Sequence, residues 1–509
     1  MSLNPSEDLL HTVESVKRIE QRAMQQMGLT SCDFMRQAAS AILTELLDEF
    51  GRPEGLTIFC GSGSNAGDGY MLAEFAANDA IPVQVFELGA VDTLSPSVAQ
   101  ARLAALKSPA QLSVYSQSMQ ISAGIVIDAL IGTGLRGSLK EWYRQAIRQI
   151  NDCDFPVVAI DVPSGLDGDT GNVPDDAVIA DLTITFIAPK QGLFTGRGPV
   201  CCGVVVWHSL NVPPEAYGAQ PPSVYRMKLP ALLEQLPLRP RDAHKAQFGH
   251  VMVIGGDIGF GGAAIMAAQA SVRAGAGLVS MATRPEHVPP MLARQPEVMA
   301  VGVVSGQELQ PLLKRSNVLV IGPGLGQSAW SEQLLQKAFD TRLPMVVDAD
   351  ALNILASGRV VSDPAKAQWI MTPHPGEAAR LLDISVREVE ANRFAAVRKL
   401  HEKYSAVVVL KGVGSLVTCD TLGGVSVCPY GNPGMASGGM GDILSGVIGA
   451  LLAQGLTLHG AAELGCCLHS YAADMASQQY GEHGLAATDL LTFIRGQLNN
   501  RDFLDELDE

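Results

Sequence analysis

Short runs of apolar and β-branched residues alternate with glycine-rich turns and helical patterns along most of this chain. Four runs come first, at residues 56–60, 125–129, 156–160 and 182–187. Six more follow, at residues 250–254, 278–283, 318–321, 345–348, 369–372 and 407–410. Strands that alternate with helices pair into largely parallel sheets with helices on their faces. The alternation therefore predicts an α/β fold.

A proline-rich segment divides the chain into two halves. Seven prolines lie between Asn211 and Pro240 and interrupt any regular pattern. At about 150 residues per domain, the 509 residues allow two to four domains. No fixed-period repeat is visible, and the two halves carry different loop motifs. We therefore predict a fusion of two α/β domains, residues 1–225 and 226–509, and not a duplication.

The acidic composition narrows the class of ligand. Acidic residues number 52 and basic residues 36, so the net charge is −16. Such a charge repels phosphate backbones and anionic lipid surfaces, so we expect neither nucleic acid nor a membrane as a partner. A phosphate-bearing ligand must then be held by backbone N–H groups, helix ends, metal ions or a few Lys and Arg side chains.

The cysteines and the N-terminal residues indicate a compartment. Nine scattered cysteines without a CxxC pair argue against a disulfide framework or a zinc site. Residues 1–21 are polar and lack the apolar stretch of a secretory signal. The longest apolar stretch, residues 443–456, contains glycines and is too short to cross a bilayer, so it predicts a buried helix. We expect a cytoplasmic protein.

Three loops at predicted strand ends carry polar residues in the first half. The first, residues 61–69, is rich in glycine and leads into a helix expected from about Tyr70. The second and third loops follow the strands predicted at residues 125–129 and 156–160. A glycine-rich loop that stands alone would more often be only a tight turn. Because the carboxyl ends of parallel strands line one crevice, we expect five side chains to converge there. They are Asn65, Asp68, Asp128, Asp161 and Ser164.

The chemistry of these side chains suits a cation and an acid–base group. Asn, Asp and Ser oxygens are hard ligands, and a spare carboxylate can transfer protons. Asp161 is the candidate acid–base group, because it follows its strand directly. An isolated Asp at a strand end is, however, most often a cap or turn former. Lys190 is either a group that neutralises ligand charge or a solvated loop lysine.

The second half has its strongest motif in residues 431–442, a glycine-dense loop that enters an apolar helix. Such a loop leaves N–H groups free to bind an oxyanion or phosphate. Asp442 falls in the first helical turn, where the helix dipole alone would favour it. The surrounding glycines favour a base instead, since phosphoryl transfer needs a carboxylate beside the anion-binding loop.

Three further loops of the second half support a nucleotide enzyme. Residues 411–415 end a strand with one lysine and several backbone donors, and residues 322–326 end another with room for a close ligand. His374 and Glu377 are two candidate metal ligands, which is weak evidence for a metal site, and His374 is equally expected as a hydrogen-bond donor. Glu377 is placed to orient magnesium-bound water.

Residues 10–215 resemble the NAD(P)H-hydrate epimerase family in three ordered motifs, at residues 61–69, 128–137 and 161–165. The resemblance implies a Rossmann-like three-layer αβα domain, and a potassium ion held by Asn65, Asp128 and Ser164. In the first motif, Ser64 and Ala66 replace the usual Asn and Gly. The residues implied to contact the hydrated nicotinamide nucleotide are Ser64, Asn65, Ala66, Gly67, Asp68, Gly132, Thr133, Gly134, Leu135, Arg136, Gly137, Ser138, Tyr143 and Asp161.

Residues 230–500 resemble the ribokinase-like fold, and more narrowly the ADP/ATP-dependent NAD(P)H-hydrate dehydratase family. The motifs that carry this resemblance include residues 322–326, 348–353, 372–377 and 432–442. The residues implied to contact the hydrate are Ala263, Gly324, His374 and Asp442. Those implied to contact the adenine nucleotide are Lys411, Gly412, Val413, Gly414, Ser415 and Gly441.

The two resemblances together imply a bifunctional metabolite-repair enzyme. The first half would interconvert the R and S forms of NADHX and NADPHX, with Asp161 as acid–base group. The second half would dehydrate the S form, with Asp442 as base, as ADP becomes AMP and phosphate. ADP is the expected donor and ATP the alternative, with Mg²⁺ and K⁺ as cofactors. The partners are then small-molecule nucleotides, and related proteins imply a homo-oligomer.

Two other hypotheses remain open from the sequence. One is a ribokinase-like small-molecule kinase with a regulatory N-terminal domain, which would release a stable phosphorylated product. The other treats the N-terminal half as a non-catalytic ligand-sensing or interaction module, since a fold does not fix a function.

Overall fold

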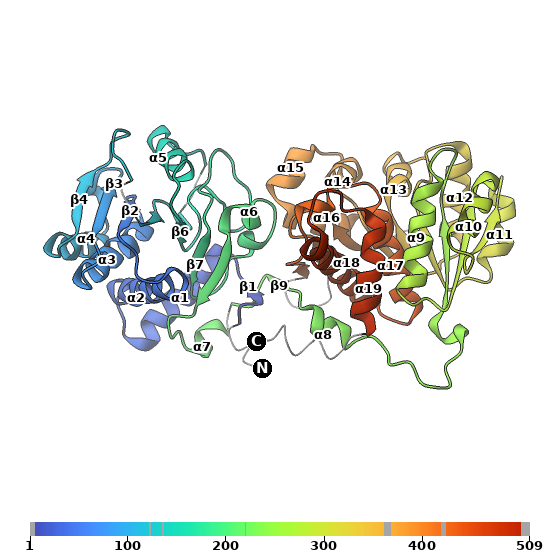
Figure 1. Ribbon diagram of the computed structural model, residues 1–509, viewed down its shortest axis with the longest axis horizontal. Helices are drawn as coiled ribbons and strands as arrows, with labels where there is room; N and C mark the ends of the chain where they lie inside the picture. The colour runs from blue at the N-terminus through green and yellow to red at the C-terminus, as the bar shows by residue number, and fades with distance from the viewer. Residues whose placement is uncertain are drawn as a thin grey trace. The chain divides into compact units, whose positions relative to one another are not determined.

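The computed structural model describes residues 6–121, 124–134, 137–218, 220–360, 368–418 and 424–499. The chain forms two compact units, which divide between Tyr225 and Arg226. Each unit is an α/β structure with its own sheet (Figure 1). The two are described separately below.

The N-terminal unit is built on a seven-stranded sheet with all neighbours parallel. In spatial order its strands are β4 (Gln111–Val114), β3 (Val83–Glu87), β2 (Leu56–Cys60), β5 (Ile125–Ala129), β6 (Val157–Ile160), β7 (Leu182–Phe186) and β8 (Val204–His208). The four strands predicted here are confirmed to within one residue. The chain runs outward in opposite directions from β2 and β5, so a ligand crevice is expected at the carboxyl ends of these two strands.

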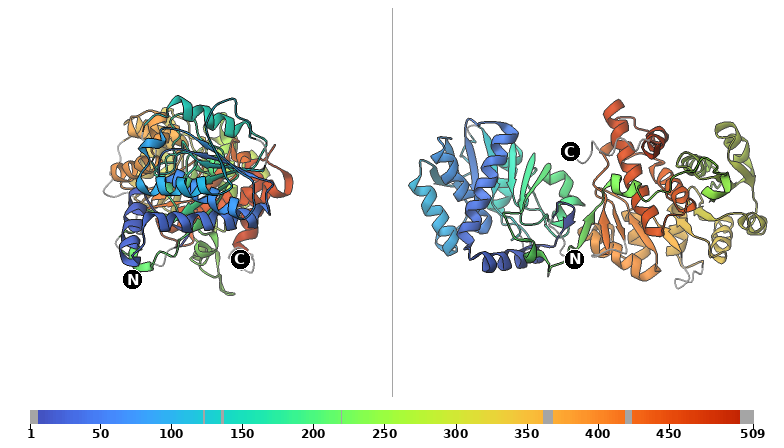
Figure 2. Two further views of the ribbon diagram at one scale, coloured as in Figure 1. Left: turned by 90° about the vertical axis from the view of Figure 1, so that its left-hand side faces the viewer. Right: turned by 90° about the horizontal axis from the view of Figure 1, so that it is seen from below.

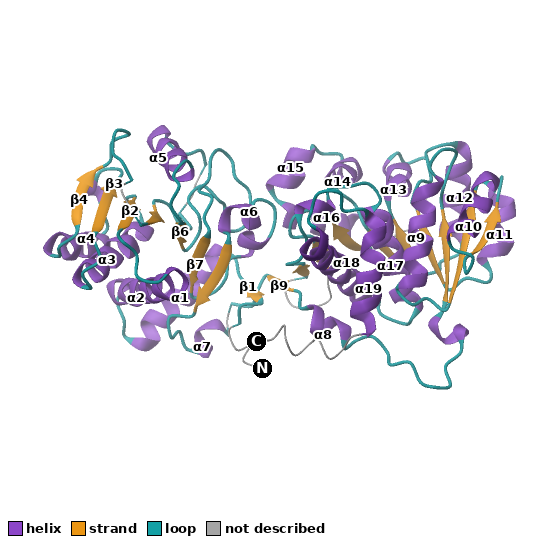
Figure 3. Ribbon diagram, in the orientation of Figure 1, coloured by secondary structure: helices purple, strands orange, loops and turns teal. Residues whose placement is uncertain are grey.

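Helices cover this sheet on both faces (Figure 3). They are α1 (Val13–Met27), α2 (Ser31–Phe50), α3 (Ser64–Asn78), α4 (Pro96–Lys107), α5 (Glu141–Asn151), α6 (Gly198–Cys202) and α7 (Pro214–Tyr217). Two short strands, β1 (Leu9–Leu10) and β9 (Val224–Arg226), pair antiparallel through Leu9, Leu10, Val224 and Tyr225.

The start of α3 corrects a prediction. The helix begins at Ser64 and not near Tyr70. Glycine density suggested a loop, but two of these glycines serve helix packing instead. A Cβ on Gly67 would lie 2.7 Å from the Met35 sulfur, and one on Gly69 would lie 2.6 Å from the Ala129 Cβ. Glycine at these positions lets α3 approach α2 and the sheet closely.

The C-terminal unit contains a larger sheet that is parallel except at one edge. In spatial order it runs β18 (Val425–Val427), β17 (Leu416–Thr418), β16 (Val407–Leu410), β15 (Trp369–Met371), β14 (Met345–Val347), β13 (Val318–Ile321), β10 (His250–Ile254), β11 (Leu278–Thr283) and β12 (Met299–Gly302). The six predicted strands are confirmed to within one residue. Strand order reverses between β10 and β13, which places a second expected crevice there.

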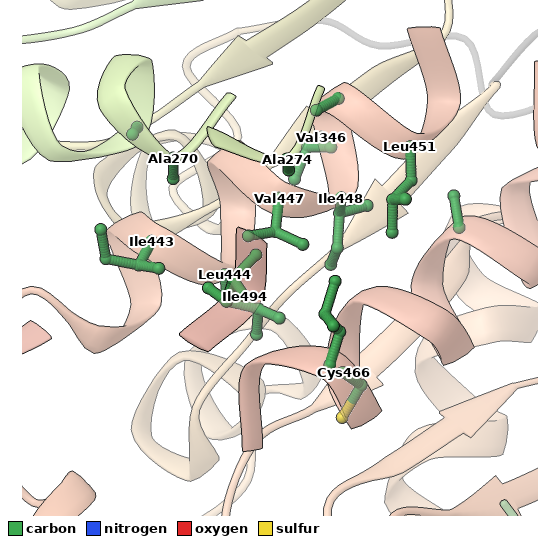
Figure 4. Packing of buried hydrophobic residues seen from close by; sticks show 14 of the residues in the cluster. Ala270, Ala274, Val346, Ile443, Leu444, Val447, Ile448, Leu451, Cys466 and Ile494 are labelled. Atoms are coloured by element: carbon green, nitrogen blue, oxygen red, sulfur yellow. The ribbon is translucent and has the colours of Figure 1, made fainter. Parts of the chain in front are cut away.

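The apolar helix predicted from residue 443 is α17 (Met440–Ala453), and it is buried in the core of this unit. It packs with α9 (Gly261–Arg273), α18 (Leu458–Tyr480) and α19 (Leu490–Asn499) against one face of the sheet (Figure 4). A Cβ on Gly446 would lie 2.1 Å from the Ala267 carbonyl oxygen, so α17 and α9 pack too closely for a side chain there. Among the described residues, we find no helix with the length and apolarity that a membrane span requires.

The C-terminal unit contains further helices besides these four (Figure 2). They are α8 (Leu229–Leu233), α10 (Val288–Arg294), α11 (Gly306–Leu313), α12 (Ala329–Asp340), α13 (Ala349–Ala356), α14 (Pro375–Leu382), α15 (Val386–Ala391) and α16 (Arg393–Tyr404).

Candidate active sites

A cavity of about 420 Å³ lies at the carboxyl edge of the N-terminal sheet. Loops after β2, β5 and β6 line it, together with one face of α1 and part of α2. The predicted substrate-binding residues among its lining are Ser64, Asn65, Asp68, Gly132, Thr133, Gly134, Tyr143 and Asp161.

The other predicted contacts of this unit lie elsewhere. Ala66 and Gly67 are buried in the first turn of α3, and Gly137 and Ser138 are exposed beyond the cavity. Leu135 and Arg136 lie outside the described residues.

Asp161 is held by a buried lysine. Its φ of +69° is a conformation that residues other than glycine rarely adopt. Its Oδ1 accepts hydrogen bonds from Lys190 Nζ and, at 3.2 Å, from Thr185 Oγ1. Lys190 is 1% exposed, and its ammonium also donates to the Phe186 carbonyl oxygen at 2.9 Å. Lys190 is therefore not a solvated loop lysine but the fixed partner of the candidate acid–base group.

Two more carboxyl groups line the same cavity, those of Asp68 and Glu20. Burial raises the pKa of Asp68 well above its ordinary value, and Asp161 and Glu20 raise it further. Burial also raises the pKa of Glu20, with Asp161 as the next cause, while Lys190 opposes both shifts. Glu20 was not among the predicted site residues. A sequence signal existed, since Glu20 shares a helical stripe with Val13 and Val16 at spacings of seven and four residues.

The predicted cation ligands come together beside this cavity. Asp128 is fully buried, and its carboxylate accepts hydrogen bonds from the Ser164 backbone N–H at 2.7 Å and the Ser164 hydroxyl at 2.6 Å. Burial nevertheless raises the pKa of Asp128 to about 6. The Asn65 side chain adjoins the loop after β5, because a Cβ on Gly132 would lie 3.0 Å from Asn65 Oδ1. Asn65 Nδ2 is buried and has no partner among the described residues.

In the C-terminal unit, Asp442 lies in the first turn of α17. The helix begins after Gly439, whose φ of +93° suits glycine. Burial raises the pKa of Asp442 to about 7, and Asp348 adds to the shift while Lys411 opposes it. The Asp442 carboxyl group forms no hydrogen bond or ion pair with any described residue, so no partner holds it in place. Its proton affinity near neutral pH suits a general base.

Lys411 gathers the charged groups around Asp442. Its ammonium lies 2.9 Å from Asp348 Oδ1 and 3.8 Å from Glu377 Oε2. Asp348 also accepts a hydrogen bond from the Ser445 hydroxyl of α17 at 2.7 Å. Burial disfavours the ammonium, but the two carboxylates outweigh burial and raise the pKa of Lys411. A Cβ on Gly441 would lie 3.2 Å from Lys411 Nζ, so the predicted nucleotide contacts Lys411 and Gly441 are neighbours.

His374 and Glu377 cap the start of α14. The His374 backbone N–H donates to Glu377 Oε2 at 2.8 Å, and His374 Nδ1 accepts from the Gly376 N–H at 2.9 Å. Burial lowers the pKa of His374, and Lys411 lowers it further. Across the described residues, no group of three His, Cys, Asp or Glu side chains is arranged to hold a metal ion.

The remaining predicted residues shape two loops at the sheet edge. A Cβ on Gly324 would lie 3.1 Å from the Ala263 Cβ, so these predicted hydrate contacts adjoin. Gly412 has a φ of +139°, and the Ser415 hydroxyl donates to its carbonyl oxygen at 2.9 Å. Val413 is exposed and Gly414 has a φ of +60°. The loop after β16 therefore presents its backbone next to Lys411.

Comparisons with known proteins match both halves of the chain to protein families. Residues 31–192 match the family model described as YjeF-related protein N-terminus, and residues 251–495 match that of NAD(P)H-hydrate dehydratase. In solved structures, a ribokinase-like superfamily protein of Enterococcus faecalis matches with a TM-score of 0.50 and 28% identity, over 55% of this chain and 96% of that chain.

Two relatives match almost the whole chain. A bifunctional NAD(P)H-hydrate repair enzyme of Coxiella burnetii is 44% identical, over 96% of this chain and 99% of its own length. A protein of the same description from Escherichia coli is 39% identical, over 98% of this chain and 96% of its own length. The chain therefore belongs to the family of bifunctional NAD(P)H-hydrate repair enzymes.

Proposed function

We propose that the N-terminal unit interconverts the R and S forms of NADHX and NADPHX, and that the C-terminal unit dehydrates the S form at the expense of ADP. One observation carries the proposal. Each unit places one carboxylate, Asp161 or Asp442, near a lysine at the carboxyl edge of its parallel sheet. The match of both units to one bifunctional family favours this function over a kinase with a sensing domain.

In the N-terminal unit, the reacting atom is C6 of the hydrated nicotinamide ring, which carries a hydroxyl group and the ring nitrogen. The nitrogen lone pair can expel that hydroxyl group once it receives a proton, and water can return to either face. Asp161 is the proposed proton-transfer group beside the hydroxyl. Lys190 offsets the charge of Asp161 and holds it in place through the ion pair.

Asn65, Asp128 and Ser164 fit the proposed potassium ion. All three offer oxygen atoms, and burial raises the pKa of the Asp128 carboxyl group to about 6, a shift that a nearby positive charge would oppose. When bound, the ion would supply that positive charge and attract a phosphate group of the substrate. The residues themselves shape the loops after β5 and β6 through the Ser164–Asp128 hydrogen bonds.

In the C-terminal unit, Asp442 takes the proton of the C6 hydroxyl, whose oxygen then attacks the terminal phosphorus of ADP. AMP leaves, and the N–H groups at the start of α17, together with Lys411, stabilise the charge on the transferred phosphoryl group. The ring nitrogen's lone pair then expels phosphate, and loss of a ring proton restores NADH or NADPH.

ADP is proposed as the donor in preference to ATP, because fused chains of this kind resemble the bacterial ADP-dependent group. Glu377 offers a hard oxygen acceptor that would orient magnesium-bound water, and the ion would partly neutralise the nucleotide phosphates. We also propose a cytoplasmic location, supported by the eight described cysteines, which are all free thiols. The homo-oligomer stays a prediction.

The test is an assay on an equilibrated mixture of R and S hydrates with Mg²⁺, K⁺ and ADP. Recovery of reduced-nicotinamide absorbance is followed to completion. Rapid recovery from the whole mixture is expected, because the epimerase feeds the R form to the dehydratase. Recovery from only the S fraction would contradict the epimerase, and a stable phosphorylated product would favour the kinase hypothesis.

A further inference from the structure

Epimerisation at C6 requires proton transfer on both faces of the nicotinamide ring. On one face an acid protonates the departing hydroxyl group, while on the other a base takes a proton from the incoming water. A single fixed side chain such as Asp161, which its bonds to Lys190 and Thr185 hold in one position, reaches one face only. This inference rests on the proposed epimerase, and it asks which residue serves the second face.

Three carboxyl groups line the cavity, and they come from different elements of the fold. Asp161 and Asp68 stand at the edge of the sheet, after β6 and in α3 after β2. Glu20 instead comes from α1, whose residues Val13, Val16, Lys17 and Glu20 form one helical stripe along the cavity. Glu20 is thus the cavity carboxyl group that does not share the sheet edge with Asp161.

Glu20 is also free to act. Within the described part of the chain, its carboxyl group forms no hydrogen bond or ion pair, whereas Glu14 on the same helix pairs with Arg18 at 3.0 Å. A half-buried carboxyl group beside a ligand cavity, without a structural partner, is costly to retain unless the ligand uses it. Asp68 is less suited, because it stands at the same sheet edge as Asp161, and burial raises its pKa well above the ordinary value.

We propose that Glu20 is the second acid–base residue of the epimerase, acting on the face of the nicotinamide ring away from Asp161. In one direction, protonated Glu20 gives its proton to the C6 hydroxyl, the C6–O bond breaks, and water leaves as the ring nitrogen's lone pair forms a C=N bond. A new water adds to the other face of C6 and gives a proton to the Asp161 carboxylate. The reverse direction exchanges the two roles, and atoms and charge balance in both.

The test compares Glu20→Gln with Glu14→Gln in the full-length protein. Glutamine keeps the size of the side chain and removes its proton transfer, and Glu14 is the matched control on the same helix, with an exposed side chain. Epimerisation is measured on each purified epimer. We expect Glu20→Gln to lower kcat about 100-fold with little change in KM, the range typical of one acid–base group. Glu14→Gln should retain the wild-type rate.

A second measurement separates catalysis from a merely structural role. Each epimer is incubated in ¹⁸O-labelled water, and the exchange of the C6 hydroxyl oxygen is followed by mass spectrometry. In Glu20→Gln, Asp161 still releases and returns water on its own face, so one epimer should exchange its oxygen without inversion. The other epimer should neither exchange nor invert.

Two outcomes overturn the proposal: inversion by Glu20→Gln at the wild-type rate, or equal loss of exchange from both epimers. Hydrogen exchange of peptides from β2 and β5 in the same variant reports that the N-terminal unit has folded. Failure of the proposed function is distinguishable, because the wild-type protein would then invert neither epimer.

Discussion

The two units use a lysine in different ways at the carboxyl edges of their sheets. In the N-terminal unit, Lys190 contacts the proposed acid–base residue Asp161 itself. In the C-terminal unit, Lys411 contacts Asp348 and leaves Asp442 without a fixed partner. Each sheet thus gathers carboxylates and a lysine at one edge. The lysine contacts the proposed acid–base residue in the N-terminal unit, but a neighbouring carboxylate in the C-terminal unit.

This difference indicates that the ion-pair partner of a carboxylate determines how readily the carboxylate exchanges a proton. Asp442 is half-buried near Asp348, Asp350 and Glu377, and its pKa of about 7 lets it lose and regain a proton under ordinary conditions. Asp161 is tied by an ion pair to a lysine that is 1% exposed. We infer that Asp442 can act as a base because no side chain holds its carboxyl group. The activity of Asp161, in contrast, depends on its ion pair with Lys190.

The largest expected effect comes from removing the unpaired base. Asp442→Asn should lower the dehydratase kcat by about 10³-fold, since one acid–base group contributes roughly 10²–10⁴-fold. Recovery of NADH from S-NADHX with ADP measures it. Asp340→Asn, at a half-exposed position of α12, is the control and should retain activity. Epimerase activity should be unchanged in both, and a fully active Asp442→Asn protein would remove Asp442 from the mechanism.

Replacing Lys190, the partner of Asp161, tests the N-terminal unit in the same comparison. Lys190→Met should lower epimerase activity about 100-fold and destabilise the N-terminal unit by about 3 kcal/mol, because breaking a buried pair leaves an uncompensated charge. Chemical unfolding and an epimerase assay measure the two effects.

The double variant Lys190→Met/Asp161→Asn is the control for charge. It should regain most of the stability and none of the activity, since the uncompensated carboxylate has been removed. If Lys190→Met alone is as stable and as active as the wild type, the ion pair has no role of the kind argued above.

The pH dependence should differ between the two activities. The base Asp442 must lose its proton to act, so the dehydratase kcat/KM should fall about tenfold per pH unit below about 7 and level off above it. A pH series on S-NADHX with saturating ADP measures this limb. A profile that is flat between pH 5 and 7 would show that Asp442 does not carry the titrating proton in the free enzyme.

Much of this comparison could be predicted from sequence because parallel strands end at a common edge. The residues after β2, β5 and β6 were expected to meet, and the structure brings Asp128 and Ser164 into direct contact. The burial of Lys190 and the approach of Glu20 were not predicted. Both depend on how distant segments pack over the cavity. The helical stripe of Val13, Val16 and Glu20 indicates which side chains share a face, but not what that face packs against.

The start of α3 shows the same limit at short range. Glycine favours turns when a residue is considered alone, but Gly67 and Gly69 allow a helix to pack against Met35 and Ala129. Only the neighbouring element decides which of the two uses applies. Helix boundaries inside a glycine-rich motif are therefore harder to predict than the strand that precedes it.

The smallest expected effect separates the units by their response to potassium. Ion concentrations of ten to a hundred times Kd should stabilise the N-terminal unit by about 1.4–2.7 kcal/mol, and leave the C-terminal unit unchanged. Hydrogen exchange of peptides from β5 and from α17, at constant ionic strength with Na⁺ as the control ion, resolves the two units.

Asn65→Ala sharpens this last test. Asn65 Nδ2 has no partner in the described chain, so its removal should cost little stability without K⁺. The variant should nevertheless lose most of the potassium-dependent protection, because one of the three oxygen ligands is gone. Equal protection of β5 by K⁺ and Na⁺, or an undiminished response in Asn65→Ala, would contradict the assignment. The raised pKa of Asp128 would then reflect burial that no bound cation offsets.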